Sequence, residues 1–284
     1  MRETIFWTAA CLALAMSAGC SGDTTGPDTE EKIAVFANLY VGQTVTGESS
    51  VLVSRVLPIL DPYDPDQAAI DDAVVTLRRE AAEPETLAAA GRGHYVTDAL
   101  RIEPRMTYHL EVAIPGRPLI MATTTTPDTL GLLSEPRTVP ETMRHAAIPD
   151  SFPIVLDSPE PSQILLVDVY CEEAWEDARY LEPFAGHDKP DDSREYGGDN
   201  GEPRHIFAYM RYEDLEHFET HRIINFYDAM MVFWGHYTVT IAAIDDNTYD
   251  YLYREHPEEN GGVSGAIGLF GSAYRKAYHV EIVE

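Results

Sequence analysis

Positively charged residues are scarce in this sequence. Its 284 residues include 20 Lys and Arg against 48 Asp and Glu, which gives a formal net charge of -28 at pH 7. Nucleic-acid binding relies on cations that neutralise phosphates, so this balance excludes nucleic acid as a partner. Anionic lipid surfaces repel such a chain as well, and attachment to a membrane would therefore need an anchor rather than a basic patch.

Long hydrophobic runs are also missing. The longest apolar run near the start, from Ile5 to Met16, is too short to span a bilayer, but it follows Arg2 and precedes small residues, as in a signal peptide. Ser17-Ala18-Gly19-Cys20 resembles the bacterial lipobox, which implies that Cys20 is diacylated and becomes the mature N-terminus. We therefore expect residues 1–20 to be a lipoprotein signal peptide; an ordinary signal peptide and an uncleaved helix are the alternatives.

Cysteine is rare, with three residues in the whole chain. Cys11 belongs to the expected signal peptide and Cys20 to the lipidation site, so Cys171 is left alone and no internal disulfide is expected. Cys171 ends the apolar run "QILLVDVYC", where a thiol usually packs as a small inert hydrophobe. A catalytic cysteine is not expected.

Hydrophobic residues make up 44% of the chain, which is enough for folded cores. Residues 21–31 are small, polar and acidic, and we interpret them as a flexible tether. Residues 32–127 contain short β-like runs separated by turn residues, which predicts an immunoglobulin-like or prealbumin-like β-sandwich. In "TYHLEVAI", Tyr108, Leu110 and Val112 alternate with polar residues, as in a strand with one face in water.

Residues 128–150 are rich in proline and lack alternation, so we expect a linker there. Residues 151–284 resume the β-like runs and form the second predicted β-rich domain. "DDNTYDYLYREH" differs from them, because Tyr249, Leu252 and Tyr253 fall on one helical face, which predicts one short helix near 247–256. The predicted fold is thus mainly β, with two β-sandwich-like domains and one short helix in the second.

Two patterns resemble metal sites. "EHFETH" places His217 and His221 four residues apart, but a zinc-protease helix needs Glu directly after the first His, where this chain has Phe218. The acidic loop 187–202 lacks the EF-hand spacing, so solvated carboxylates are favoured there. If calcium binds, the candidate ligands are Asp188, Asp191, Asp192 and Asp199.

The stretch "NGGVSGAIGLFGSAY" places glycines at 262, 265, 268 and 271. A P-loop needs Lys-Ser/Thr after its last glycine, and a dinucleotide fingerprint or a nucleophile elbow needs a following helix. A strand-like segment follows instead. We therefore interpret the glycines as scaffold that allows close backbone approach to neighbouring strands.

The lipobox, the first-domain runs "AVVTL", "GHYVTD" and "RMTYHLEVAIPGR", and the later runs "VTIAAIDDNTYDYL" and "GGVSGAIGLFG" together give a resemblance to a known family. The chain resembles the domain-of-unknown-function-4249 family of bacterial surface lipoproteins over nearly all of its mature length. The resemblance implies an outer-membrane location and association with a TonB-dependent receptor. It implies no reaction.

Three functions remain open from the sequence. We favour a non-catalytic accessory or ligand-binding lipoprotein without cofactors, anchored through Cys20 on the periplasmic or cell-surface face of the outer membrane beside a TonB-dependent transporter. Aromatic residues would supply its binding surface, with Trp234, Tyr251 and Tyr253 as the ligand-binding candidates and Phe226 and Tyr227 as further ones. Core packing is the alternative for each of these residues. An anchored metal-dependent hydrolase using His217 and His221 and a structural envelope protein are the alternatives. The ligand, the membrane face and the oligomeric state stay open.

Overall fold

The structure, a computed structural model, describes residues 32–57, 64–132, 141–144, 154–157, 163–181, 204–211, 215–218, 221–224 and 230–283. The chain divides into two units, Met1–Lys32 and Ile33–Glu284, and every described residue except Lys32 belongs to the second. The described residues form three sheets, with ten, five and four strands, and short helices between some of them. The predicted mainly β fold is confirmed.

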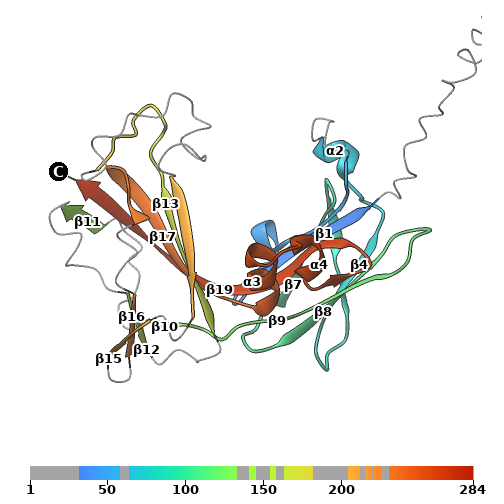
Figure 1. Cartoon of the computed structure of the whole chain (residues 1–284). Helices are drawn as coiled ribbons and strands as arrows, with labels where there is room; N and C mark the ends of the chain where they lie inside the picture. The colour runs from blue at the N-terminus through green and yellow to red at the C-terminus, as the bar shows by residue number, and fades with distance from the viewer. Residues whose placement is uncertain are drawn as a thin grey trace, which may run out of the picture. The chain divides into compact units, whose positions relative to one another are not determined.

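The ten-stranded sheet has the order β14-β13-β17-β19-β1-β3-β7-β2, with β11 and β6 pairing off this path. Figure 1 labels β13, β17, β19, β1, β7 and β11 among its strands. Its strands are β1 (Ile33–Tyr40), β2 (Thr44–Val45), β3 (Val51–Arg55), β6 (Ala88–Gly91), β7 (His94–Arg101), β11 (Glu141–Arg144), β13 (Ile164–Cys171), β14 (His205–Met210), β17 (Gly235–Ile244) and β19 (Ile267–Val283).

The five-stranded sheet has the order β18-β9-β8-β4-β5, and the four-stranded sheet has the order β10-β12-β16-β15. Their strands are β4 (Val74–Arg79), β5 (Glu85–Thr86), β8 (Thr107–Ala113), β9 (Ile120–Thr125), β18 (Val263–Ser264), β10 (Gly131–Leu132), β12 (Ile154–Asp157), β15 (Glu216–Phe218) and β16 (His221–Ile224). Between strands lie the 3-10 turn η1 (Gly47–Ser49) and the helices α2 (Pro65–Ala68), α3 (Asp246–Tyr253) and α4 (Pro257–Asn260).

Two hydrophobic cores fill the space between paired layers of strands. The first core joins β1, β3 and β7 to β4, β8 and β9, with Val35, Val53, Leu77 and Leu110 among its fully buried members. The predicted alternation in β8 is present, since Tyr108, Leu110 and Val112 are buried. Each layer hides one face of its strands, which is the sandwich-like arrangement that the sequence predicts.

The second core joins β13, β17 and β19 to β12 and β16, with Leu156, Val167, Ile224, Ile241 and Val280 at its centre. Cys171 belongs to this core and is fully buried as a free thiol, as expected for a packing residue. The helix predicted near 247–256 is present as α3, and the one-turn helix α4, which was not predicted, follows it.

The strand β19 belongs to both cores. Its first half pairs in parallel with β1 and buries Phe270 in the first core, and its second half pairs antiparallel with β17 and buries Val280 in the second (Figure 1). The last strand of the chain therefore completes the sandwich that residues 32–127 begin. The boundaries of the two predicted domains stay a prediction.

The glycines of residues 260–274 act as scaffold, as predicted. Gly268 lies opposite Val35 in the β1–β19 pairing at φ +133, and a Cβ there would collide with the Val35 carbonyl oxygen. A Cβ on Gly271 would collide with the Thr248 hydroxyl of α3. Only residues without a side chain allow β1 and α3 to approach β19 this closely.

Candidate functional site

The outward face of β13 and β14 exposes aromatic side chains beside α3. Residues 205, 207 and 209 of β14 point outward while 206, 208 and 210 turn toward the core, because side chains alternate along a strand. Phe207 is 47% exposed and Tyr209 is 40% exposed. We call the following six residues the aromatic strip: Tyr170, His205, Phe207, Tyr209, Tyr249 and Tyr253.

Neighbouring rings of the aromatic strip contact one another around His205 and around Tyr209. His205 lies with its ring centroid 5.8 Å from Tyr170 and 5.8 Å from Phe207. Tyr209 then meets the helix α3, with centroid distances of 5.2 Å to Tyr249 and 4.3 Å to Tyr253. These distances fall in the range of favourable aromatic pairs, so the rings hold one another in place on the sheet.

Two arginines border the strip. The Arg204 guanidinium lies 4.7 Å from the centre of the Tyr170 ring and donates to the Cys171 carbonyl at 3.0 Å. Arg211 donates to the Tyr249 hydroxyl at 3.3 Å, which is the largest cause of the lowered pKa of that tyrosine.

Burial raises the pKa of Tyr253, whose hydroxyl has no hydrogen-bond partner among the described residues. Ring packing rather than hydrogen bonding therefore holds Tyr253.

The aromatic residues singled out in the sequence lie in different surroundings. Tyr253 belongs to the aromatic strip, whereas Tyr251 packs edge-on against Phe36 with centroids 6.0 Å apart. Trp234 packs against the second core, and the Arg179 guanidinium lies 5.8 Å from its ring. Phe226 and Tyr227 lie outside the described residues. The structure thus does not gather Trp234, Tyr251 and Tyr253 into one surface.

Tyr170, Phe207 and Tyr209 were not predicted from the sequence. The signal for Phe207 and Tyr209 is present in "HIFAYM", where aromatic residues occupy the positions that alternate with the core-facing ones. An aromatic residue on the outward side of an amphipathic strand is the pattern to look for, since that side is normally polar.

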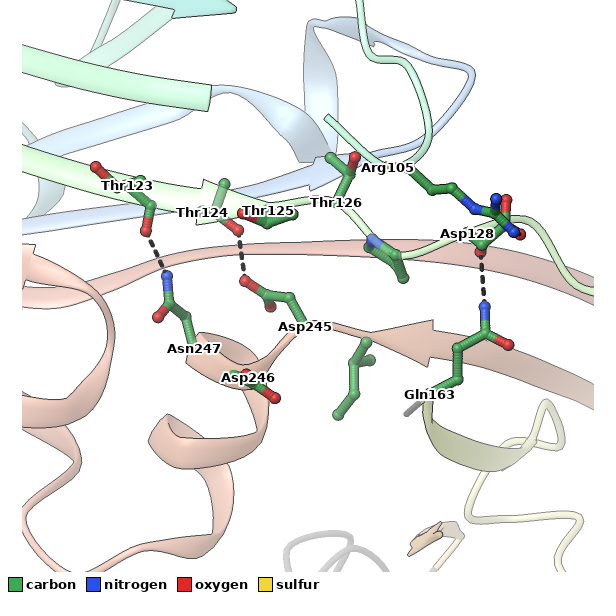
Figure 2. A pocket seen from close by; sticks show the side chains of 12 residues that line it. Arg105, Thr123, Thr124, Thr125, Thr126, Asp128, Gln163, Asp245, Asp246 and Asn247 are labelled. Carbon is green, nitrogen blue, oxygen red and sulfur yellow. Dashed lines mark hydrogen bonds and ion pairs between the residues drawn. The ribbon is translucent and has the colours of Figure 1, made fainter. Parts of the chain in front are cut away.

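A second feature is a polar pocket of about 610 Å³ between β9, the start of α3 and Gln163 (Figure 2). Four consecutive threonines, Thr123 to Thr126, line one side. Arg105 forms an ion pair with Asp128, and Gln163 donates to the Asp128 carbonyl oxygen at 3.3 Å. On the opposite side, Asn247 donates to the Thr123 carbonyl at 2.7 Å and to the Phe270 carbonyl at 2.9 Å.

Asp245 is the buried charged residue of this pocket, with 8% exposure. Its Oδ1 accepts hydrogen bonds from the Thr248 hydroxyl at 2.6 Å, the Thr248 N–H at 3.1 Å and the Ser272 N–H at 3.0 Å, and its Oδ2 accepts one from Thr124. Burial raises the pKa of Asp245, and these hydrogen bonds oppose the rise. The carboxylate caps α3 and ties it to β9 and β19, which is a structural role.

Histidine and glutamate side chains gather at the other end of the outward sheet face. The His236 side chain contacts Glu173 at 2.7 Å through Nδ1, and this hydrogen bond is the largest cause of its raised pKa. Burial raises the pKa of Glu173, but its hydrogen bonds with His236 outweigh burial and lower it overall. Glu172 accepts from Thr238, which is the largest cause of its lowered pKa, and contacts His279 at 3.2 Å. The hydrogen bond with Glu173 thus favours the charged form of His236.

The predicted metal ligands gain no support from the geometry. His217 and His221 lie in β15 and β16, where the backbone register pairs Phe218 with His221 and His217 with Arg222, so the two histidines share no helical turn. Among the described residues, no group of three or more His, Cys, Asp or Glu side chains is arranged to hold a metal ion. Asp188, Asp191, Asp192 and Asp199 lie outside the described residues, and so does the predicted lipidation site Cys20.

The chain was compared with curated proteins, with solved structures and with models of protein families. No curated protein matches the sequence. A solved structure described as "Structural insight into host cell surface retention of a 1.5-MDa bacterial ice-binding adhesin" aligns with 8% identity and a TM-score of 0.18, over 89% of this chain and 65% of that chain, just under two thirds of its length. Residues 23–266 match the family model described as "Domain of unknown function (DUF4249)", and the chain belongs to that family.

Proposed function

We propose that this protein is a non-catalytic binding lipoprotein, anchored in the outer membrane through Cys20 and acting as an accessory or ligand-binding component beside a TonB-dependent transporter. The observation that carries the binding role is the exposed aromatic strip. Large exposed apolar side chains gathered in one place mark interaction surfaces more often than scattered ones do. Phe207, Tyr209 and Tyr170 are 47%, 40% and 38% exposed and lie on two paired strands.

The surroundings of the titratable groups favour binding over catalysis. The carboxylate of Asp245 is engaged by hydrogen bonds that hold three elements together, so it is unsuited to take up a substrate proton. The His236 side chain is bound to Glu173 on an exposed sheet face, where water screens its charge. Both arrangements match structural roles.

The anchor and the partner are inferred from the sequence. The lipobox supplies two acyl chains, which is the number that stable anchoring requires. Lipid attachment confines the protein to a layer it shares with outer-membrane barrels, so weak contacts suffice for association. A protein with a net charge of -28 favours basic loops on such a partner, through contacts that salt weakens. Among the described residues, no helix has the length and apolar character needed to cross a bilayer.

Affinity purification tests this proposal. The tagged protein is isolated from gently solubilised outer membranes at low salt and at about 1 M salt, where the Debye length shrinks to about 3 Å. We expect a TonB-dependent barrel to co-purify at low salt and to dissociate at high salt. A Cys20→Ala variant, which lacks the anchor, should recover much less of it. An anchored wild-type protein that brings down no barrel at low salt would refute the transporter partnership.

A further inference from the structure

We infer that the aromatic strip is a binding site for a neutral glycan, recognised through the faces of its sugar rings. This inference rests on the proposed function as a binding protein and names the ligand class for it. Four features support a glycan: the row of rings in the strip, the polar groups around it, the net charge of the chain and the small size of the strip.

The strip offers a row of aromatic rings. Phe207 and Tyr209 are two residues apart on the same side of β14, which places their side chains about 7 Å apart along the strand. Tyr170 extends the row onto β13, and Tyr249 and Tyr253 extend it onto α3. Sugar rings present flat C–H faces that pack against aromatic rings, so an elongated row of rings suits a chain of sugars.

Hydrogen-bonding groups stand along the same row. Asp168 pairs with Phe207 across the β13–β14 ladder, and its carboxylate contacts His205 at 2.6 Å. Arg204 and Arg211 place guanidinium groups at the two ends, where they also bond to the Cys171 carbonyl and the Tyr249 hydroxyl. Tyr209 and Tyr249 carry hydroxyls. Sugar hydroxyls both donate and accept hydrogen bonds, so they match a surface that mixes carboxylate, imidazole, guanidinium and phenol groups.

The charges favour a neutral ligand over an ion. The chain carries a net charge of -28, which repels acidic polymers. A cationic ligand would seek the ring faces, but the Arg204 and Arg211 guanidinium groups already lie near the Tyr170 and Tyr249 rings, at 4.7 and 5.8 Å. A second cation there would meet a like charge.

The extent of the strip favours a glycan over a protein. A stable protein interface buries about 800 Å² on each partner and uses roughly 20–30 residues a side. The aromatic strip and its polar neighbours come from two strands and one helix and supply far fewer residues. That extent suits a few sugar units, whose binding depends on a small number of rings and polar groups.

The test uses the full-length lipidated protein in detergent. Native gels are cast with soluble starch, dextran, xylan or a β-1,3-glucan as the neutral polysaccharides and with alginate as the acidic one. We expect at least one neutral polysaccharide to retard the protein and alginate not to do so. Isothermal titration with oligosaccharides of the retarding polymer then gives the affinity.

The deciding variant is Phe207→Ala combined with Tyr209→Ala. Loss of two stacking rings should weaken the affinity by about tenfold or more. The matched control is Leu119→Ala combined with Met121→Ala, because these residues are 48% and 51% exposed and lie away from the strip, Met121 in β9 of another sheet and Leu119 just before that strand. The control should bind like wild type. Equal thermal unfolding midpoints for the two variants exclude misfolding as the cause of any loss.

Three results would overturn the inference: no retardation by any neutral polysaccharide, retardation by alginate alone, or equal affinities in the two double variants. A protein that co-purifies with a barrel through these same rings while binding no glycan also overturns it, yet leaves the proposed function standing. Glycan binding by a protein that proves to carry no lipid would support this inference and would refute the lipid anchorage of the proposed function. The two proposals therefore fail separately.

Discussion

At the scale of single residues, Asp245 shows how a buried charge is used to build the fold. Three of its hydrogen-bond donors come from different elements: Thr124 from β9, Thr248 from α3 and Ser272 from β19. Removal of the carboxylate would leave the Thr248 and Ser272 donors buried without this acceptor. Each such unsatisfied group costs about 1–3 kcal/mol.

We expect Asp245→Ala to lower the free energy of unfolding by about 3 kcal/mol or more, through lost hydrogen bonds and a lost helix cap. Asp245→Asn should stay within about 1 kcal/mol of wild type, since its carbonyl oxygen retains the Thr248 and Ser272 bonds. Its amide can donate to Thr124, whose hydroxyl then bonds to the Ser272 hydroxyl 3.0 Å away. Urea denaturation measures both values, and equal losses in the two variants would contradict this account.

The pH dependence of stability gives an independent check on the same residue. Burial raises the pKa of Asp245 in the folded state above the unfolded value, so the folded protein holds this proton more tightly. Ionisation of Asp245 at neutral pH therefore costs more free energy in the folded protein than in the unfolded chain. Protonation removes this extra cost as the pH falls through the folded-state pKa toward 3.8. The stability of wild type relative to Asp245→Asn should thus rise on acidification.

At the scale of elements, β19 depends on glycine to lie against β1. Gly116 provides the control for this claim, because it also has a positive φ, +75, but nothing lies within 4 Å of a Cβ built on it. Gly116→Ala should cost about 1 kcal/mol through backbone strain alone. Gly268→Ala should cost about 3 kcal/mol or more, because its Cβ also collides with the Val35 carbonyl oxygen. Thermal unfolding compares them, and equal midpoints would refute the role of close approach.

Elements with regular patterns were predictable from the sequence, and elements shaped by distant contacts were not. The alternation of Tyr108, Leu110 and Val112 predicted β8, and the helical spacing of Tyr249 and Tyr253 predicted α3. The start of β19 was missed because glycines carry no hydrophobic pattern, although their scaffold role was predicted. The aromatic strip was missed because pairing of β13 with β14, and contact of Tyr209 with α3, bring together residues far apart in sequence.

At the scale of the whole molecule, the net charge and the proposed lipid anchor have opposite effects. The charge repels the protein from anionic lipid, whereas the anchor would attach it to the membrane. The net charge of -28 repels the chain from anionic lipid, so the attachment that we propose would depend on lipid at Cys20. The segment 21–31 between Cys20 and β1 is itself acidic and polar. Neither the segment nor the chain as a whole therefore favours direct contact with anionic lipid.

Labelling cells with an acyl-chain analogue tests the anchor directly. Wild type should incorporate the label and fractionate with the outer membrane, because Ser21 rather than Asp follows the lipidated cysteine and no inner-membrane retention signal is expected. Cys20→Ala should take up no label and should leave the outer-membrane fraction. Cys11→Ala is the matched control, since it removes a thiol from the same leader and should label like wild type. Equal labelling of wild type and Cys20→Ala would show that Cys20 carries no lipid, and the proposed anchorage would have to be abandoned.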